Sequence, residues 1–383
     1  MRTSGGPDVE ARGARMKSEI RPALRLPLLA AGFVALALGA GAGLARMDWA
    51  FPLPDSRLIA WHGPLMIAGF FGTVISLERA VALAARWAYA APVAAALGAL
   101  ALVAAMPLAA MLLFVAAGLA LLAASVAIFL RQRALFTFTP ALGAACWAVG
   151  NLLWLGGAGT IAATPWWTGF LVLTIAGERL ELSRLLPPSP FAKTVFAVIV
   201  AAILASLVLA FAFPRAGFAA QAAGLLALAL WLVRQDIARR TVRERGLTRF
   251  VAVCLISGYG WLGAGAAILL VDGFLPALGA RDAGLHAILL GFVFSMVLGH
   301  APIIFPAVTR AAMPYHWSSY IPLALLQVSL AIRIAGDLAE VADWRRLGGM
   351  ANAAALLLFV LGTIASVVRG KLAAHGNRAG DRG

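Results

Sequence analysis

Three of the five histidines in this sequence lie within long apolar stretches, where an ionisable side chain is uncommon. His62 begins the segment HGPLMIAGFFGTVISLER, and the segment HAILLGFVFSMVLGH runs from His286 to His300. A neutral imidazole is the commonest metal ligand in proteins and also exchanges protons near neutral pH. The three residues therefore indicate either a metal-centred cofactor site or a proton-exchange site, unless each only donates a hydrogen bond to a neighbouring helix.

The apolar stretches that carry these histidines are long enough to cross a lipid bilayer. The 383 residues are 62% hydrophobic and only 12% charged, which is not the composition of a soluble domain. Lipid admits only helices and closed barrels, and runs this apolar are not barrel strands. We therefore expect an all-α, multi-pass membrane bundle of about twelve helices, near residues 23–45, 58–83, 88–106, 108–130, 134–158, 164–186, 191–213, 217–233, 248–271, 283–309, 318–336 and 347–368.

Positive charge is unevenly distributed between the two sides of such a bundle. If the N-terminus is cytoplasmic, the outer segments hold only seven of the 31 Lys and Arg residues. This bias follows the positive-inside rule, and it predicts cytoplasmic termini in a bacterial inner membrane rather than a nucleic-acid partner. We expect a basic disordered arm over residues 1–22, a single transmembrane domain over 23–369 and a polar tail over 370–383.

His62 and His286 are expected at nearly the same depth, because each lies a few residues inside a span that runs inward from the outer face. Two neutral imidazoles at one depth on two helices can hold a haem iron from opposite sides. Small or flexible residues follow on the helix face of His62, namely Met66, Gly69, Thr73 and Ser76. They leave room for a flat macrocycle, so we predict a haem b with His62 and His286 as axial ligands.

The propionates of a haem need cations, and guanidinium groups suit carboxylates. Arg345 and Arg346 lie in the last outer loop, on the same side as the two histidines. Arg57 and Trp61 stand just before His62. We count these four as candidate cofactor-binding residues, with the arginines on the propionates.

A weak repeat links three of the expected spans. The segments GFFGTVISLER, GFLVLTIAGER and GFVFSMVLGH begin at Gly69, Gly169 and Gly291. Each places a polar residue nine positions after its glycine, and these residues are Glu78, Glu178 and His300. Internal duplication explains the pattern, and so does close helix packing through the glycines alone.

The deeper polar residues allow more than one interpretation. At about 100° per residue, His300 returns to the helix face of His286, where it is a candidate ligand of a second metal. Alternatively, the chain is a cofactor-free secondary transporter that exchanges protons through His300, Glu78 and Glu178. Glu78 can also simply pair with the inner arginines, and a subunit that only assembles through its glycine faces is a third option.

Two stretches resemble the NnrS family of bacterial membrane proteins. Trp61-His62-x3-Met66-x2-Gly69-Phe70 is similar to that family's early motif, and His286-Ala287-Ile288 to its late motif. The opening RPALRLPLLAAGF and the segment AGER at 176–179 also look like parts of the family. The resemblance implies haem and copper binding and a role in nitric oxide metabolism or nitrosative stress, with metal binding carried onto His62 and His286. Pro64 stands where the family commonly has a second histidine, which speaks against copper.

The expected architecture also resembles haem-copper oxidase subunit I. Histidines near the outer ends of the second and tenth spans, with an arginine pair between the last two, look like its low-spin haem site. Those oxidases hold copper with three histidines of the sixth and seventh spans, and these spans of the present chain contain none. The resemblance implies a haem-binding core without that copper site, with electron transfer as one role and a redox protein or quinone as its partner.

Overall fold

The structure is a computed structural model that describes residues 20–182, 188–275 and 279–380, and all its regular elements over these residues are helices. Twelve of the helical segments have the length and apolar composition needed to cross a membrane. This confirms the predicted all-α bundle of about twelve spans. Most of the expected basic arm, residues 1–19, lies outside the described residues.

The spans follow one another with short connections. In chain order they are α2 (Pro22–Ala45), Ser56–Leu83, Arg86–Val103 with α5 (Ala90–Val103), α6 (Pro107–Arg131), α7 (Leu135–Leu155), α8 (Gly159–Leu182), α9 (Pro190–Ala212), α10 (Pro214–Gln235), α12 (Gly246–Phe274), Ala280–Thr309, Trp317–Leu338 with α15 (Tyr320–Leu338), and α16 (Ala342–Gly380). A short helix, α11 (Ala238–Thr241), links α10 to α12. Each span overlaps a predicted apolar run, because lipid selects for helices of this length and composition.

The two spans that carry His62 and His286 are not continuous α-helices. In the second span, η1 (Ser56–Trp61) and α3 (His62–Pro64) lead into a π-helical stretch, η2 (Leu65–Phe71), and then into α4 (Gly72–Leu83). In the tenth, α13 (Ala280–His286) leads into π-helical η5 (Ala287–Phe292) and then α14 (Val293–Thr309). A π-turn holds more residues than an α-turn, and such stretches are frequent at functional sites.

The helices pack in an order that recurs three times along the chain. In each group of four spans the first packs on the second, the third on the fourth, and the fourth on the first span of the next group, with α16 returning to α2. The second spans of the groups also meet one another, through α3 on α8 and α14 on α4 and α8. These are the spans that share the Gly-Phe repeat, so the packing supports internal duplication.

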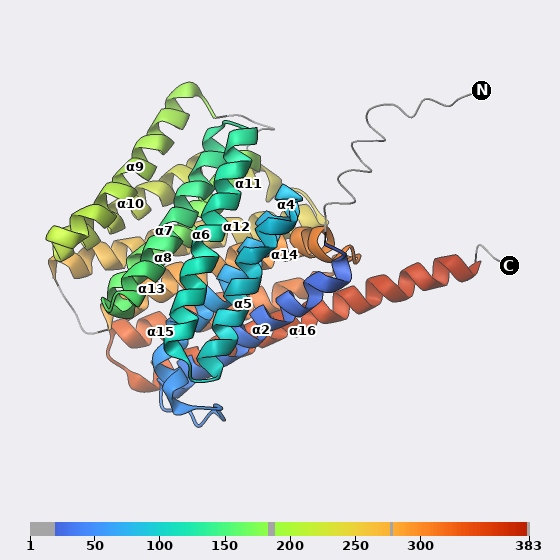
Figure 1. Cartoon of the computed structure of the whole chain (residues 1–383), viewed down its shortest axis with the longest axis horizontal. Helices are drawn as coiled ribbons and strands as arrows, with labels where there is room; N and C mark the ends of the chain where they lie inside the picture. The colour runs from blue at the N-terminus through green and yellow to red at the C-terminus, as the bar shows by residue number, and fades with distance from the viewer. Residues whose placement is uncertain (1–19, 183–187, 276–278, 381–383) are drawn as a thin grey trace.

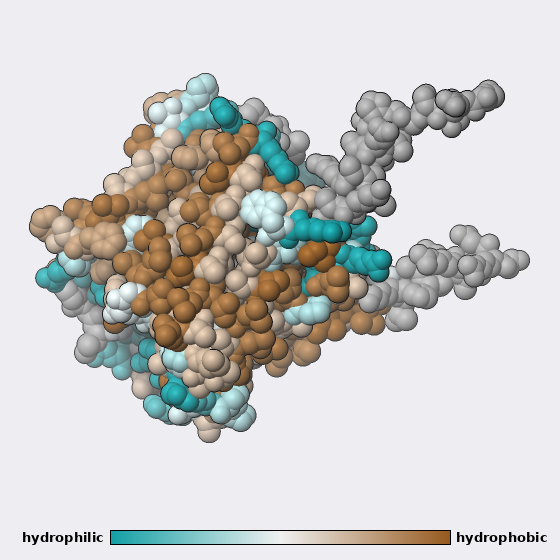
Figure 2. All heavy atoms as spheres, in the orientation of Figure 1, coloured by the Kyte–Doolittle hydropathy of each residue, from teal (hydrophilic) through white to brown (hydrophobic). Residues whose placement is uncertain are grey.

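The surface and the ends of the bundle fit a bilayer. Figure 2 shows apolar side chains over most of the visible face, with polar groups gathered toward its ends. In Figure 1, α2 begins on the same side of the bundle as α16 ends, as twelve alternating spans require. We call the end of the bundle where α2 begins and α16 ends the terminal end. The opposite end, which contains residues 46–57, is the far end. The last helix continues to Gly380, so residues expected as a polar tail extend α16.

Candidate functional site

His62 and His286 lie opposite each other near the far end, one at the start of each π-containing span. Their ring centres are 6.2 Å apart, and the two ring planes are within 16° of parallel. The residues are distant in sequence, and the contacts of their spans with α2 and α15 bring them together. The fold thus brings these two histidines, from different spans, close together.

In each of these histidines, Nδ1 lies within hydrogen-bond distance of a backbone carbonyl oxygen, whereas Nε2 has no hydrogen-bond partner among the residues that the structure describes. Nδ1 of His62 lies 2.7 Å from the carbonyl oxygen of Gly39, and Nδ1 of His286 lies 2.8 Å from that of Asp282. A carbonyl oxygen can only accept a hydrogen bond, so we assign the ring hydrogen to Nδ1 in both residues. The lone pair of Nε2 then remains on each ring, which is the arrangement found in metal-bound histidines.

A cavity of about 270 Å³ adjoins both imidazoles. Its apolar lining includes Phe71, Trp167 and Phe294, and its polar lining includes three arginines besides the two histidines. Ligand pockets in proteins are typically apolar with a few converging polar groups, which is the composition found here. The cavity therefore suits a ligand with an apolar body and a charged edge.

Glycines of α2 make room for the His62 ring. A Cβ atom added to Gly43 would lie 2.9 Å from Cε1 of His62, and one added to Gly39 would lie 2.8 Å from Sδ of Met66. A larger residue at either position would force these side chains to move. The small residues of α2 thus allow the close approach that lets its carbonyl group orient His62.

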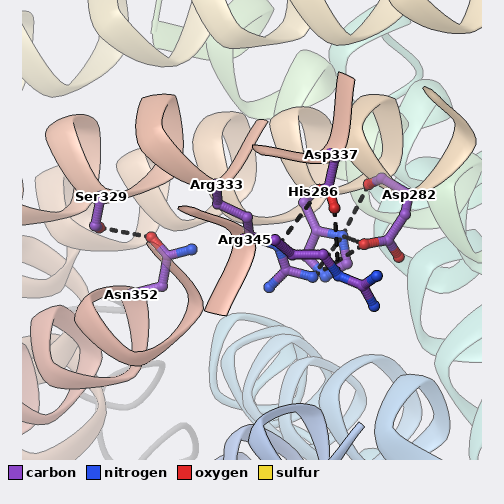
Figure 3. A network of polar contacts seen from close by, with 7 residues as sticks. All are labelled: Asp282, His286, Ser329, Arg333, Asp337, Arg345 and Asn352. Atoms are coloured by element: carbon purple, nitrogen blue, oxygen red, sulfur yellow. Dashed lines mark hydrogen bonds and ion pairs between the residues drawn. The ribbon is translucent and has the colours of Figure 1, made fainter. Parts of the chain in front are cut away.

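An ion-pair network lies beside His286, as Figure 3 shows. Arg333 of α15 donates to Oδ2 of Asp282 at 3.0 Å, and its Nε is 3.8 Å from Oδ2 of Asp337. Arg345 of α16 is 3.4 Å from the other oxygen of Asp337. Both arginines line the cavity, as does Arg46 at the end of α2. Three guanidinium groups thus face two carboxylates, which leaves an excess of positive charge for an anionic ligand group.

The hairpin of α15 and α16 is tight enough to place both arginines on the cavity. A Cβ atom added to Gly348 would lie 2.5 Å from the backbone nitrogen of Arg333, and one added to Gly336 would clash with that of Arg345. Ser329 of α15 also donates to Asn352 of α16 at 2.6 Å. These contacts fix the register of the two helices and with it the positions of the two guanidinium groups.

The other predicted cofactor residues are not part of the cavity lining. Arg57 donates to the carboxylate of Asp55, two residues before it, and this bond lowers the pKa of Asp55. Arg346 donates to the carbonyl oxygen of Asp48, and its guanidinium lies over the Trp49 ring. Trp61 packs against the apolar core. We therefore place only Arg345 of the predicted cation set at the site.

His300 lies deeper, away from the cavity, with both ring nitrogens engaged. Its Nδ1 is 2.6 Å from the carbonyl oxygen of Met296, and its Nε2 accepts from Arg179. Nearby, Arg79 donates to Glu178 at 2.6 Å, and Glu78 lies within electrostatic range of both. The repeat residues Glu178 and His300 thus each pair with an arginine from another span.

Sequence reasoning missed Asp282 and Arg333 as members of the site. The signal was present, because Asp282 is four residues before His286 and Arg333 four before Asp337, with each pair in or directly beside an apolar run. Side chains at this spacing lie on one helix face, and paired ionisable residues within a membrane span usually mark function. The two i, i+4 pairs could therefore have been combined into one predicted network.

A bare metal ion would find few protein ligands here. Among the residues that the structure describes, no group of three or more His, Cys, Asp or Glu side chains is placed to hold a metal ion. The two imidazoles of the cavity supply two nitrogen atoms of the kind that bind metals.

Residues 25–368 match the sequence profile of a family described as "Domain of unknown function (DUF8744)". The match overlaps all twelve spans and includes both histidines of the cavity. No curated protein matches the chain.

Proposed function

The chain belongs to the DUF8744 family. For this chain we propose a function as a membrane haem protein that holds haem b between His62 and His286. The observation that carries the proposal is the facing pair of imidazoles with both Nε2 lone pairs left over. The iron would supply one-electron oxidation and reduction when bound.

The spacing of the two rings fits one iron between them. A metal lies about 2 Å from a ligating histidine nitrogen, and that nitrogen lies roughly 1 Å from the ring centre, so two imidazoles that hold one metal through Nε2 would have their ring centres no more than about 6 Å apart. The observed separation is 6.2 Å. The hydrogen bonds from Nδ1 to the carbonyl oxygens of Gly39 and Asp282 would hold both rings in their orientation and raise the basicity of Nε2.

The charges of the cavity suit the carboxylates of the macrocycle. Arg345 and Arg46 line the cavity near the far end, where propionates would reach them. Arg333 already pairs with Asp282 and Asp337, and its main effect is to position His286 and Arg345 through the network. We therefore assign anion binding to Arg345 and Arg46 and positioning to Arg333.

Ligation by both histidines favours electron transfer over other haem chemistry. With two protein ligands on the iron, no position is left for a small molecule unless a histidine moves away. Nitric oxide handling, which the NnrS resemblance implies, would thus require such a displacement. Electron transfer across the outer half of the membrane is the role that we propose, with a redox protein or a quinone as partner.

A cofactor-free secondary transporter is the second candidate, and one observation favours it. Arg79, Glu178, Arg179 and His300 form two buried or partly buried contacts between spans, at membrane depth. Ionisable groups in such positions often move protons. Each of these contacts also fulfils a simpler role as a link between spans.

The optical spectrum of the purified protein separates the two candidates. The protein would be expressed with an ample haem supply, and a reduced-minus-oxidised spectrum, a pyridine haemochrome and an iron and copper analysis recorded. We expect one b-type haem per chain, lost in H62A and in H286A and kept in H316A, because His316 is an exposed histidine outside the spanning bundle core. A colourless protein, or haem retained by both cavity variants, would overturn the proposal.

A further inference from the structure

A second cavity lies beside the first, between α8, α10, α12 and α13. Its volume is about 190 Å³, and its lining is largely apolar, with Phe218 and Leu225 among the wall residues. Two arginines, Arg215 and Arg281, line it as well, together with Asp272. Neither histidine of the first cavity takes part in it.

The threefold packing order relates the two cavities. The first cavity is lined by the tenth, eleventh, twelfth, first and second spans, together with part of the sixth. The second is lined by the sixth, eighth, ninth and tenth spans. The twelve spans can be counted as a closed ring, since α16 packs on α2. Counting back four places in this ring, the tenth, twelfth, first and second spans correspond to the sixth, eighth, ninth and tenth, and the helices of each group pack alike. The second cavity is therefore the internal counterpart of the first.

The repeat shows which residues stand in place of the histidines. His286 lies five residues before the repeat glycine Gly291, and Thr164 lies five residues before Gly169. His62 lies seven residues before Gly69, and Gly284 lies seven before Gly291. Thr164 lines the second cavity, whereas Gly284 offers no side chain at all. The counterpart cavity thus has no imidazole with which to bind a metal.

The cationic character of the first cavity is nevertheless repeated. Arg345 is the fourth residue of α16, and Arg215 is the second residue of α10. The two helices correspond, because each is the fourth span of its group. Arg281 lies at the same end of the bundle, with its guanidinium 5.1 Å from the centre of the Phe218 ring and its Nε 3.9 Å from Asp272. Two guanidinium groups and one carboxylate leave one positive charge in excess at this edge.

We propose that the second cavity binds an amphipathic anion, with the apolar part between α8, α10 and α12 and a carboxylate or phosphate group between Arg215 and Arg281. Guanidinium groups bind both of these anions through paired hydrogen bonds. Thr164, Ile161 and Leu285 line both cavities, so the bound molecule lies one layer of side chains from the histidine pair. The site needs no metal and no occupant in the first cavity.

Native mass spectrometry of the delipidated full chain in detergent tests this site. The probes are palmitate and phosphatidylglycerol as anions, with hexadecanol and diacylglycerol as their uncharged partners. We expect a single bound anion and a preference over the matched probe of about tenfold or more, since a hydrogen bond to a charged group is worth about 1.5–3 kcal/mol. Preference for palmitate identifies a free carboxylate as the ligand, and preference for phosphatidylglycerol a lipid headgroup.

Substitutions locate the binding. In R215Q/R281Q the retention of the anion should fall about tenfold or more. R215K/R281K should fall less, because the charges remain while the paired hydrogen bonds of the guanidinium groups are lost. Arg243 lies on the segment between α11 and α12, away from the cavity, so R243Q serves as the matched control and should bind like the parent. Equal retention of charged and uncharged probes, or unchanged binding in R215Q/R281Q, would overturn the proposal.

Discussion

The shortest hydrogen-bond contacts of His62 and His286 are with backbone carbonyl oxygens. Each ring donates from Nδ1 to a carbonyl oxygen, and each Nε2 is left as an acceptor. Charged groups act on the pair from a second layer, with the Asp282 carboxylate 3.4 Å from Nδ1 of His286 and Arg345 on the cavity wall. The backbone carbonyl groups therefore orient the two imidazoles, and the charged side chains tune them electrostatically.

Substitutions in this second layer should shift the midpoint potential of the proposed haem in opposite directions. A carboxylate favours the oxidised form, so D282N should raise the potential, whereas R345Q should lower it. A unit charge roughly 8 Å away is worth about 2 kcal/mol at an effective dielectric constant of 20, which corresponds to shifts on the order of 50–100 mV.

Redox titration followed by optical absorption measures these shifts. Because the bond to His286 comes from the backbone of Asp282, D282N should keep the low-spin spectrum. Shifts of the same sign in both variants would argue against an electrostatic role for these residues.

At the scale of the helices, the spans were predictable and their rotation was not. Hydropathy located all twelve spans, because a helix in lipid must be apolar over its whole length. His300 was expected on the face of His286 from a uniform 100° per residue, yet η5 intervenes. One extra residue in a π-turn rotates the remainder of the helix by roughly 100°, and His300 meets Arg179 instead.

The arginines show the same limit for side-chain partners. Arg345 could be placed at the far end from its position between the last two apolar runs, although it lies in α16 and not in a loop. Arg57, in contrast, is held by its near neighbour Asp55, and Arg346 lies over Trp49. Such local partners compete with a cofactor, and no hydropathy pattern reports them. Arg333 reaches the site only through the close packing of α15 on α16, which is a tertiary feature.

The contact of α2 with the second span should be sensitive to a single methyl group. In G43A, the new Cβ atom would lie 2.9 Å from the His62 ring and force it out of its present position. We expect lower haem occupancy and a partly high-spin optical spectrum. Gly260 has nothing within 4 Å of its added Cβ atom, so G260A is the matched control and should retain the parent spectrum. Full low-spin haem in G43A would contradict this account of α2.

Across the whole molecule, the twelve spans form three groups of four, and the second spans of the three groups contact one another. The histidine cavity lies between the third group and the first, at the far end. The excess of basic residues on the terminal side predicts that this end is cytoplasmic, which would place the cavity near the outer leaflet.

Cysteine labelling in intact cells tests this orientation. The natural Cys146 and Cys254 are buried, so a membrane-impermeant maleimide should react only with introduced thiols. We expect S56C, at the far end, to react in intact cells, and S318C, at the terminal end, to react only after lysis. The reverse pattern would invert the orientation of the bundle.

The most direct test of the histidine pair is the electron paramagnetic resonance spectrum of the frozen, oxidised protein. Nearly parallel ligand planes, here within 16°, split the iron orbitals strongly and give a rhombic low-spin ferric signal. We predict such a signal at one spin per chain in the parent and its conversion to a high-spin signal, or its loss with the haem, in H62A and in H286A. A parent protein with only high-spin iron or no haem signal, or a low-spin signal unchanged in both variants, would contradict ligation by this pair.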